Sequence, residues 1–183
     1  EDKGSRYVDP IVEVNGELRG PLRGQYGPEV YTDFLLDFIS RNKDRPWFGY
    51  YPMALPHTPF NPTPHSADWA TGNRLKDDDR YFGDMVEYID HLIGRITDHL
   101  QKEGLRENTL ILFYSDHGAS MRIVSDTVSG PVRGGKKRPT DPGTRVPMIA
   151  SWPAVTPAGG VCEDLVDSTD FWPTIAEVGR IGG

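Results

Sequence analysis

Apolar residues recur at helical spacing in two long segments of the chain. The spacing predicts helices over about 28–42 and about 79–102, each with one apolar stripe. The acidic run 77–79 stands where the dipole of the second helix favours negative charge. A shorter pattern predicts a last helix between Thr169 and Gly179.

Three short apolar runs are typical of strands. Residues 46–53 are aromatic and bounded by prolines, residues 109–115 are continuously apolar, and residues 146–152 carry a proline near their start. A continuous apolar run indicates a strand buried on both faces, and Pro147 keeps the third strand at its start or on an edge. Helices alternating with strands predict an α/β fold with a mixed, mostly parallel sheet flanked by helices.

The remaining stretches lack a clear period. Residues 1–27 are rich in Gly, Pro and charge and predict an irregular segment, with residues 11–14 as a short strand piece. Residues 55–65 contain too many prolines for a helix and predict a rigid loop. Residues 119–144 are polar, Gly-rich and basic, which predicts a long loop.

Composition narrows the classes of function. The chain has 183 residues, 20 Lys and Arg against 27 Asp and Glu, and a net charge of −7. Its length suits one domain, and its acidity disfavours general nucleic-acid binding, because an acidic chain repels phosphate. No apolar run approaches the roughly 18 residues of a membrane span. The single cysteine, Cys162, excludes an internal disulfide framework and a Cys-rich zinc site.

The start of the chain carries no signal peptide. Glu1–Gly4 lacks both a basic and an apolar region, and the chain does not begin with Met. We therefore expect a processed, trimmed or partial product.

Asp116 and His117 are the first candidates for chemistry. They directly follow the predicted strand 109–115, and Gly118 lets the chain turn sharply. Ligands of open α/β sheets gather at the carboxyl ends of strands, and a carboxylate with one imidazole is compatible with Ca²⁺ or Mg²⁺. Taken alone, the three residues favour the alternative, an Asp that caps the next turn beside a His with a satisfied partner.

The basic run 133–138 is the second candidate. Its two glycines free the backbone to approach an anion, and Lys136 adds a positive charge. One interpretation is a phosphate or sulfate cradle, and the alternative is a solvated basic loop. Nucleic-acid binding is disfavoured, because no aromatic residues interleave with the charges.

His57 is the third candidate. It follows the predicted strand 46–53 on the proline-rich loop, so its ring is held in one direction and could donate a hydrogen bond to an anion or a leaving group. A structural histidine bonded to the backbone is at least as common in such a place. His65 has a weaker case, and His91 and His99 are expected at the surface or boundary of the long helix.

Four motifs occur in a fixed order along residues 29–180. They are Trp47–Tyr51 with Pro56–Pro59, Asn108–Gly118, Gly134–Lys136 with Asp141–Pro147, and Asp167–Ile175. Their order and spacing resemble the sulfatase family of the alkaline-phosphatase-like superfamily. In that family a strand leads to a Pro-His-x-Pro loop, and a second metal-binding block, a Gly-Gly-Lys … Arg-Val-Pro block and a helix follow.

The resemblance implies a role for each matching residue. Asp116 and His117 would be ligands of Ca²⁺ or Mg²⁺. Lys136 would contact both the sulfate and the nucleophile, and His57 would bind sulfate or protonate the leaving alkoxide. Arg145 would bind substrate. The substrate would be a sulfate ester, and the location periplasmic or extracellular.

The sequence also departs from the family pattern. Asp141 replaces a Glu and Pro142 replaces a Gly. In their N-terminal part, sulfatases carry a Cys/Ser-x-Pro-x-Arg motif, whose first residue becomes the formylglycine nucleophile, together with paired Asp ligands, and neither block stands ahead of the Pro-His-x-Pro loop here. Cys162 is not followed by Pro two residues on. We therefore expect residues 1–183 to be one partial catalytic domain that lacks the N-terminal nucleophile block and has no turnover by itself.

Three functions remain in competition. The first is a sulfatase, and the second is a phosphodiesterase or phosphonate hydrolase of the same superfamily, which shares the Asp-His block. The third is a non-catalytic anion-binding module, a pseudoenzyme. In each case a truncated sheet would expose an edge that invites self-association.

Overall fold

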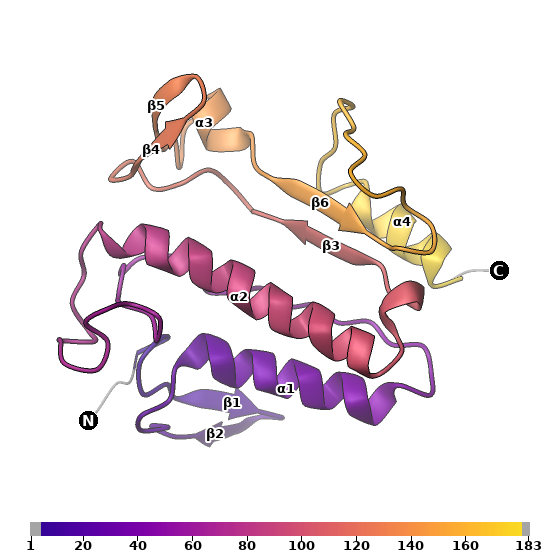
Figure 1. Ribbon diagram of the computed structural model, residues 1–183, viewed down its shortest axis with the longest axis horizontal. Helices are drawn as coiled ribbons and strands as arrows, with labels where there is room; N and C mark the ends of the chain where they lie inside the picture. The colour runs from indigo at the N-terminus through magenta and orange to yellow at the C-terminus, as the bar shows by residue number, and fades with distance from the viewer. Residues whose placement is uncertain (1–4, 181–183) are drawn as a thin grey trace.

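Two helices form the framework of the computed structural model, which describes residues 5–180 (Figure 1). α1 spans Gly27–Asn42 and α2 spans Tyr81–Lys102, and they lie side by side with the same chain direction. Both helices predicted from apolar spacing are confirmed. Gly104 follows the end of α2 at φ +71°, and its N–H donates to the carbonyl oxygen of Gln101 at 3.1 Å.

The N-terminal segment packs against the start of α1. The N–H of Gly27 donates to the carbonyl oxygen of Tyr7 at 2.7 Å, and a Cβ on Gly27 would lie 2.1 Å from the carbonyl oxygen of Arg6. The segment also forms a hairpin of β1 (Val12–Val14) and β2 (Glu17–Arg19). The strand predicted in this otherwise irregular stretch is therefore confirmed, while residues 1–4 lie outside the described part.

The core packs α2 against the N-terminal segment and the proline-rich loop. Met85, Tyr88 and Leu92 are buried on one face of α2, as its apolar stripe predicted. The full cluster consists of Tyr7, Val8, Tyr26, Leu55, Phe60, Tyr81, Met85, Tyr88, Leu92 and Ile123. Burial of each large apolar side chain contributes roughly 1.5–3 kcal/mol relative to exposure. This cluster is therefore the main source of stability.

The strands form three separate ladders. β3 (Ile111–Tyr114) pairs with β6 (Met148–Ser151), and β4 (Val124–Thr127) pairs with β5 (Gly130–Arg133). The predicted α/β class is confirmed, but every ladder within residues 5–180 is antiparallel, so the expected parallel pairing is not found there. Parallel pairing needs a crossover, usually a helix. The connection from β3 to β6 instead contains a hairpin and the four-residue helix α3 (Asp141–Thr144).

Three further predictions from the sequence were wrong. Residues 46–53 form no strand, because nothing within residues 5–180 pairs with them, and they line an open apolar groove beside α1. Residues 119–144 are not one irregular loop, since they contain β4, β5 and α3. In addition, β3 is only partly buried rather than covered on both faces.

The end of the described chain follows the expected pattern. The predicted last helix is confirmed as α4, over Phe171–Val178, and a short 3₁₀ turn, η1, spans Arg106–Asn108. Tyr114 of β3 packs against Phe171 of α4 with ring centroids 4.3 Å apart. Within the described residues, no helix combines the length and the apolar character needed to cross a membrane.

Candidate functional site

Three loops that carry sequence motifs are joined by backbone hydrogen bonds. The N–H of Gly118 donates to the carbonyl oxygen of Gly143 at 3.0 Å, and the N–H of Gly135 donates to that of Pro142 at 3.1 Å. The N–H of Lys136 donates to the carbonyl oxygen of Ala119 at 3.0 Å. Segments 116–119, 134–138 and 140–145 therefore form one unit, which we call the loop cluster. It follows directly on the end of β3.

Glycine is required where these backbones meet. A Cβ on Gly118 would lie 1.9 Å from the carbonyl oxygen of Pro142, and a Cβ on Gly143 would lie 2.1 Å from that of Arg138. Real side chains cannot approach a carbonyl so closely. The sequence indicated a sharp turn at Gly118, and the structure shows a close backbone contact there.

Asp116 and His117 present adjacent ligand atoms at the rim of the loop cluster. Asp116 Oδ2 lies 3.2 Å from His117 Nε2, and the Asp116 side chain is 81% exposed. His117 Nδ1 lies 3.0 Å from the carbonyl oxygen of Gly118. Because a carbonyl only accepts hydrogen bonds, Nδ1 donates in this contact, which turns Nε2 toward the Asp116 carboxylate.

This donor set fits part of a divalent metal site. One carboxylate and one neutral imidazole can both bind a divalent cation, and the carboxylate suits Ca²⁺ or Mg²⁺. Within residues 5–180, no group of three or more His, Cys, Asp or Glu side chains could hold a metal ion. The two residues offer at most two ligand positions, so a complete divalent metal site would need further ligands.

Two basic residues project from the same loop cluster. Lys136 is half-buried, and its backbone is fixed by the bond to Ala119. Arg145 is 82% exposed and lies 4.0 Å from Asp141, so its guanidinium is open to a ligand. Among residues 5–180, no carboxylate forms a short ion pair with Lys136 or Arg145, so both side chains could bind an anion.

His57 lies on the proline-rich loop, away from these contacts. The Tyr7 hydroxyl lies 2.6 Å from the carbonyl oxygen of His57, and burial raises the pKa of Tyr7 to about 12. His57 Nδ1 lies 2.7 Å from the carbonyl oxygen of Thr58, so it donates and leaves Nε2 free. Arg6 adds a positive charge 3.3 Å from the same ring. No hydrogen bond or ion pair in the described chain joins His57 to the loop cluster.

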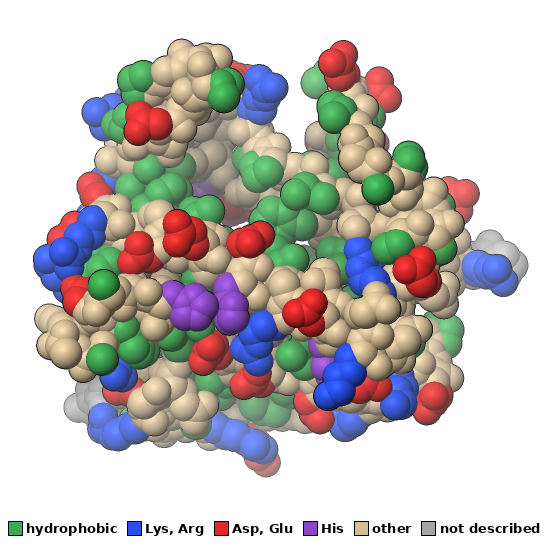
Figure 2. All heavy atoms as spheres, viewed as in Figure 1, with side chains coloured by type: hydrophobic (Ala, Val, Ile, Leu, Met, Phe, Trp, Pro, Cys, Tyr) green, Lys and Arg blue, Asp and Glu red, His purple; other side chains and the backbone are tan. Residues whose placement is uncertain are grey.

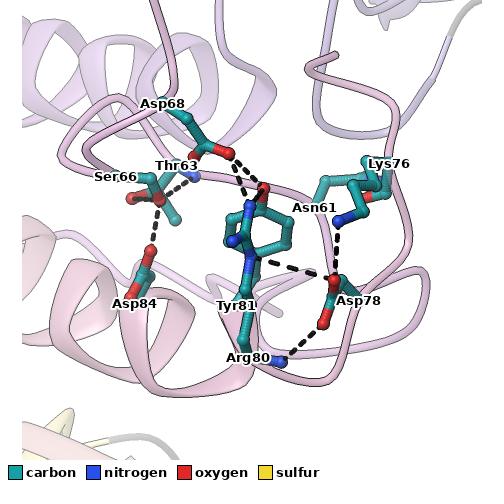
Figure 3. Close-up of polar contacts among 9 residues, drawn as sticks. All are labelled: Asn61, Thr63, Ser66, Asp68, Lys76, Asp78, Arg80, Tyr81 and Asp84. Carbon is teal, nitrogen blue, oxygen red and sulfur yellow. Dashed lines mark hydrogen bonds and ion pairs between the residues drawn. The ribbon is translucent and has the colours of Figure 1, made fainter. Parts of the chain in front are cut away.

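A polar network secures the loop between His57 and α2 (Figure 3). Asp68 Oδ2 accepts a hydrogen bond from the Tyr81 hydroxyl at 2.6 Å and from Arg80 at 2.6 Å. The bond from Tyr81 lowers the pKa of Asp68. Ser66 donates to Asp84 on the first turn of α2. The loop is thus tied to the helix by side chains that carry no recognisable motif.

Sequence reasoning missed a contact between Arg122, three residues after segment 116–119 of the loop cluster, and the acidic run 77–79 before α2. Arg122 pairs with Asp77 at 3.0 Å and with Asp79 at 2.6 Å. The sequence assigned the acidic run 77–79 to the helix dipole alone. No local signal could reveal a pairing of residues 45 positions apart.

Comparisons with known proteins agree with this architecture. A family model described as Sulfatase matches residues 3–181. The chain is 32% identical to the steryl-sulfatase of Rattus norvegicus, over 78% of this chain and 24% of that protein. It is 31% identical to arylsulfatase H of Homo sapiens, over 96% of this chain and 31% of that protein. The chain thus spans only a quarter to a third of these relatives.

Solved structures give the same result. The crystal structure of Ps i-CgsB superposes with a TM-score of 0.74 at 29% identity, over 93% of this chain and 37% of that one. The structure of Ps i-CgsB in complex with k-i-k-neocarrahexaose also gives a TM-score of 0.74, at 28% identity, over 95% and 38% of the two chains.

Proposed function

This chain belongs to the sulfatase family, and from that membership we propose that the complete protein hydrolyses a sulfate ester. The observation that supports this most directly is the loop cluster. It joins the Asp116–His117 pair to the loop of Lys136 by backbone hydrogen bonds, so a ligand pair for a cation and a free positive charge lie on one unit. Positive charge that is already in place, from a bound cation and from Lys136, stabilises a bound anion.

In this proposal Asp116 and His117 hold Ca²⁺ or Mg²⁺ together with ligands outside residues 1–183. The bound ion would supply positive charge next to the sulfate. His117 keeps Nε2 available because the Gly118 carbonyl binds Nδ1. Asp116 needs no rearrangement, since its carboxylate is already exposed beside Nε2.

The basic side chains act on the substrate itself. Lys136 and Arg145 attract the negatively charged sulfate, and Lys136 also contacts the nucleophile. The leaving oxygen gains negative charge as its bond to sulfur breaks. His57 would donate a proton from Nε2 to that oxygen, or bind the sulfate with it. The Thr58 carbonyl fixes the ring by its bond to Nδ1.

The nucleophile is expected outside this sequence. The one stretch of residues 1–183 that matches Cys/Ser-x-Pro-x-Arg, Ser129–Arg133, lies on the exposed β4–β5 hairpin and not in the N-terminal position that the family's nucleophile motif occupies. The proposal therefore predicts no turnover by residues 1–183 alone. It includes a periplasmic or extracellular location and self-association through unpaired strand edges. Fractionation and the measured mass in solution test these two points.

The deciding experiment compares the complete protein with residues 1–183. Both are assayed on an aryl sulfate and an aryl phosphodiester, with and without Ca²⁺. Because the neighbour Ps i-CgsB was solved with k-i-k-neocarrahexaose, an oligosaccharide substrate belongs in the same panel.

Each outcome of this assay has a distinct meaning. Turnover of the sulfate by the complete protein alone, lost in Lys136→Ala, supports the proposal. Preference for the diester would assign the protein to the sister hydrolases. Absence of turnover from a protein with confirmed formylglycine would favour the non-catalytic anion-binding module.

A further inference from the structure

We propose that Arg122 is a positioning residue that fixes the loop cluster relative to the loop of His57. This inference rests on the proposed function, because it concerns the geometry of the same site. Arg122 is not itself a candidate to touch the substrate. Its contacts point instead to the two structural units that carry the candidate residues.

The first unit is the Gly-Gly-Lys loop, which is hydrogen-bonded to segment 119–123. The carbonyl oxygen of Ala119 accepts the N–H of Lys136, and that of Ile123 accepts the N–H of Gly134 at 2.9 Å. Ala119 also packs against the buried core, and Ile123 belongs to it. Any shift of this segment therefore carries the Gly-Gly-Lys loop with it. Arg122 lies within this segment, so an interaction that fixes Arg122 also fixes the position of Lys136.

The second unit begins at Asp77. Its carboxylate accepts two bonds from Arg122, with Nη1 3.0 Å from Oδ2 and Nη2 3.2 Å from Oδ1. A bidentate arginine–carboxylate pair fixes orientation as well as distance. The hydrogen bond from Arg122 lowers the pKa of Asp77, so the pair stays charged at neutral pH. Asp79 adds a second carboxylate 2.6 Å from Nη2.

Asp77 in turn holds the segment that follows His57. Its Oδ1 accepts the backbone N–H of Phe60 at 3.0 Å, and the Phe60 carbonyl accepts the N–H of Asp78 at 3.0 Å. The guanidinium of Arg122 also lies over the Phe60 ring, 5.1 Å from its centroid. Phe60 is fully buried and three residues from His57. A continuous set of contacts therefore leads from Lys136 through Arg122 to the His57 loop.

These contacts matter more for geometry than for stability. The carboxylates and the guanidinium are all between 42% and 49% exposed, and exposed ion pairs contribute little to folding. A displacement of about 1 Å in a catalytic group can nevertheless lower turnover by roughly 100-fold. A residue that joins two loops at the surface is suited to prevent such a displacement.

The chain offers a matched control in Arg80. Arg80 also pairs with two carboxylates, Asp68 at 2.6 Å and Asp78 at 3.8 Å, and lies 4.6 Å from the centroid of the Tyr81 ring. Its contacts stay within the loop before α2 and do not reach the loop cluster. Arg122→Ala and Arg80→Ala therefore remove similar interactions. Only Arg122→Ala breaks a contact between segment 119–123 and the loop before α2.

The experiment measures turnover and amide hydrogen exchange in the complete protein. Arg122→Ala should lower kcat/KM for the sulfate ester by about tenfold or more, mostly through kcat. Arg80→Ala should change it by less than about twofold. Arg122→Lys should recover only part of the loss, because lysine keeps the charge without the bidentate geometry. Exchange at the amides of Gly134 and Lys136 should accelerate in Arg122→Ala alone.

The exchange measurement separates this inference from the proposed function. If the unaltered protein has no sulfate turnover, the proposed function fails, while exchange still tests the link. Unchanged exchange at Lys136 in Arg122→Ala overturns the inference. It is also overturned if Arg80→Ala lowers kcat/KM equally. If Arg122→Ala does not fold, Asp79→Asn removes one ion pair, and it should give a smaller change in the same direction.

Discussion

The two parts of this molecule are stabilised by different interactions. In the described part of the chain, every buried apolar side chain lies between Tyr7 and Ile123, and residues 124–180 bury none. Figure 2 shows apolar side chains at the surface in the upper part of the view, where Figure 1 places β3, β6 and the β4–β5 hairpin. Within residues 124–180, Met148 is 36% and Ile149 is 56% exposed.

The difference shows how the site is supported. The first part is held by side-chain packing, and the loop cluster is held by backbone hydrogen bonds and glycine contacts. Packing can absorb some changes of side chain, whereas backbone contacts at this distance cannot. The candidate chemistry therefore lies on a scaffold that depends on the first part for stability and on glycine for shape.

The largest expected effect separates the two parts by stability. Leu92→Ala, in the packed part, should lower the free energy of unfolding by about 3 kcal/mol, because it leaves a cavity in the core. Ile149→Ala, at an exposed site on β6, should lower it by less than about 1 kcal/mol. Urea unfolding measures both. Equal losses would contradict the contrast between the parts.

The next effect concerns the shape of the loop cluster. Gly118→Ala places a methyl group against the Pro142 carbonyl, so the loops must separate. We expect a loss of about 100-fold in sulfate turnover by the complete protein. Gly94→Ala on α2 is the control, because nothing lies within 4 Å of its Cβ. That change should leave turnover intact and stabilise the helix by about 0.5–1 kcal/mol. Retained activity in Gly118→Ala would show that the loops tolerate separation.

The smallest expected effect is the change in stability of the packed part at alkaline pH. Burial raises the pKa of Tyr7 from 10.0 to about 12, so the folded state disfavours its ionised form. This contribution to stability is fully present below pH 10 and is lost as pH rises toward 12. Burial raises the pKa of Tyr26 as well, in the same direction.

Tyr7→Phe tests the part of this dependence that belongs to Tyr7. The variant should lose about 1 kcal/mol at neutral pH with the hydrogen bonds of the hydroxyl, and its stability should fall less steeply above pH 10. Thermal unfolding between pH 7 and 11 measures both changes. An unchanged slope would assign the alkaline loss to other groups.

Local pattern predicted the helices but not the pairing of strands. α1, α2 and α4 have strong apolar periodicity, which tertiary contacts did not override. Residues 46–53 have strand-like composition, but a strand also needs a neighbour, and none is present within the described residues. The β4–β5 hairpin escaped prediction because its strands are short, polar and exposed, so no buried face marks them.

The sequence singled out candidate residues but did not predict how they assemble. Asp116, His117, Lys136 and Arg145 lie on loops that backbone hydrogen bonds join, and their roles remain predictions. The pairing of Arg122 with Asp77 depends on how two distant loops fold together. Such a contact depends on the tertiary structure, and the spacing of residues in the sequence does not predict it.

The close backbone contacts at Gly118 and Gly143 also limit which substitutions this protein can accept. In a saturation library across residues 116–145, both positions should be depleted of every substitution, even when cells are selected only for folded protein. Exposed positions such as Arg145 should vary freely in that selection and become restricted only when turnover is selected. Comparing the two selections would distinguish residues kept for backbone fit from residues kept for chemistry.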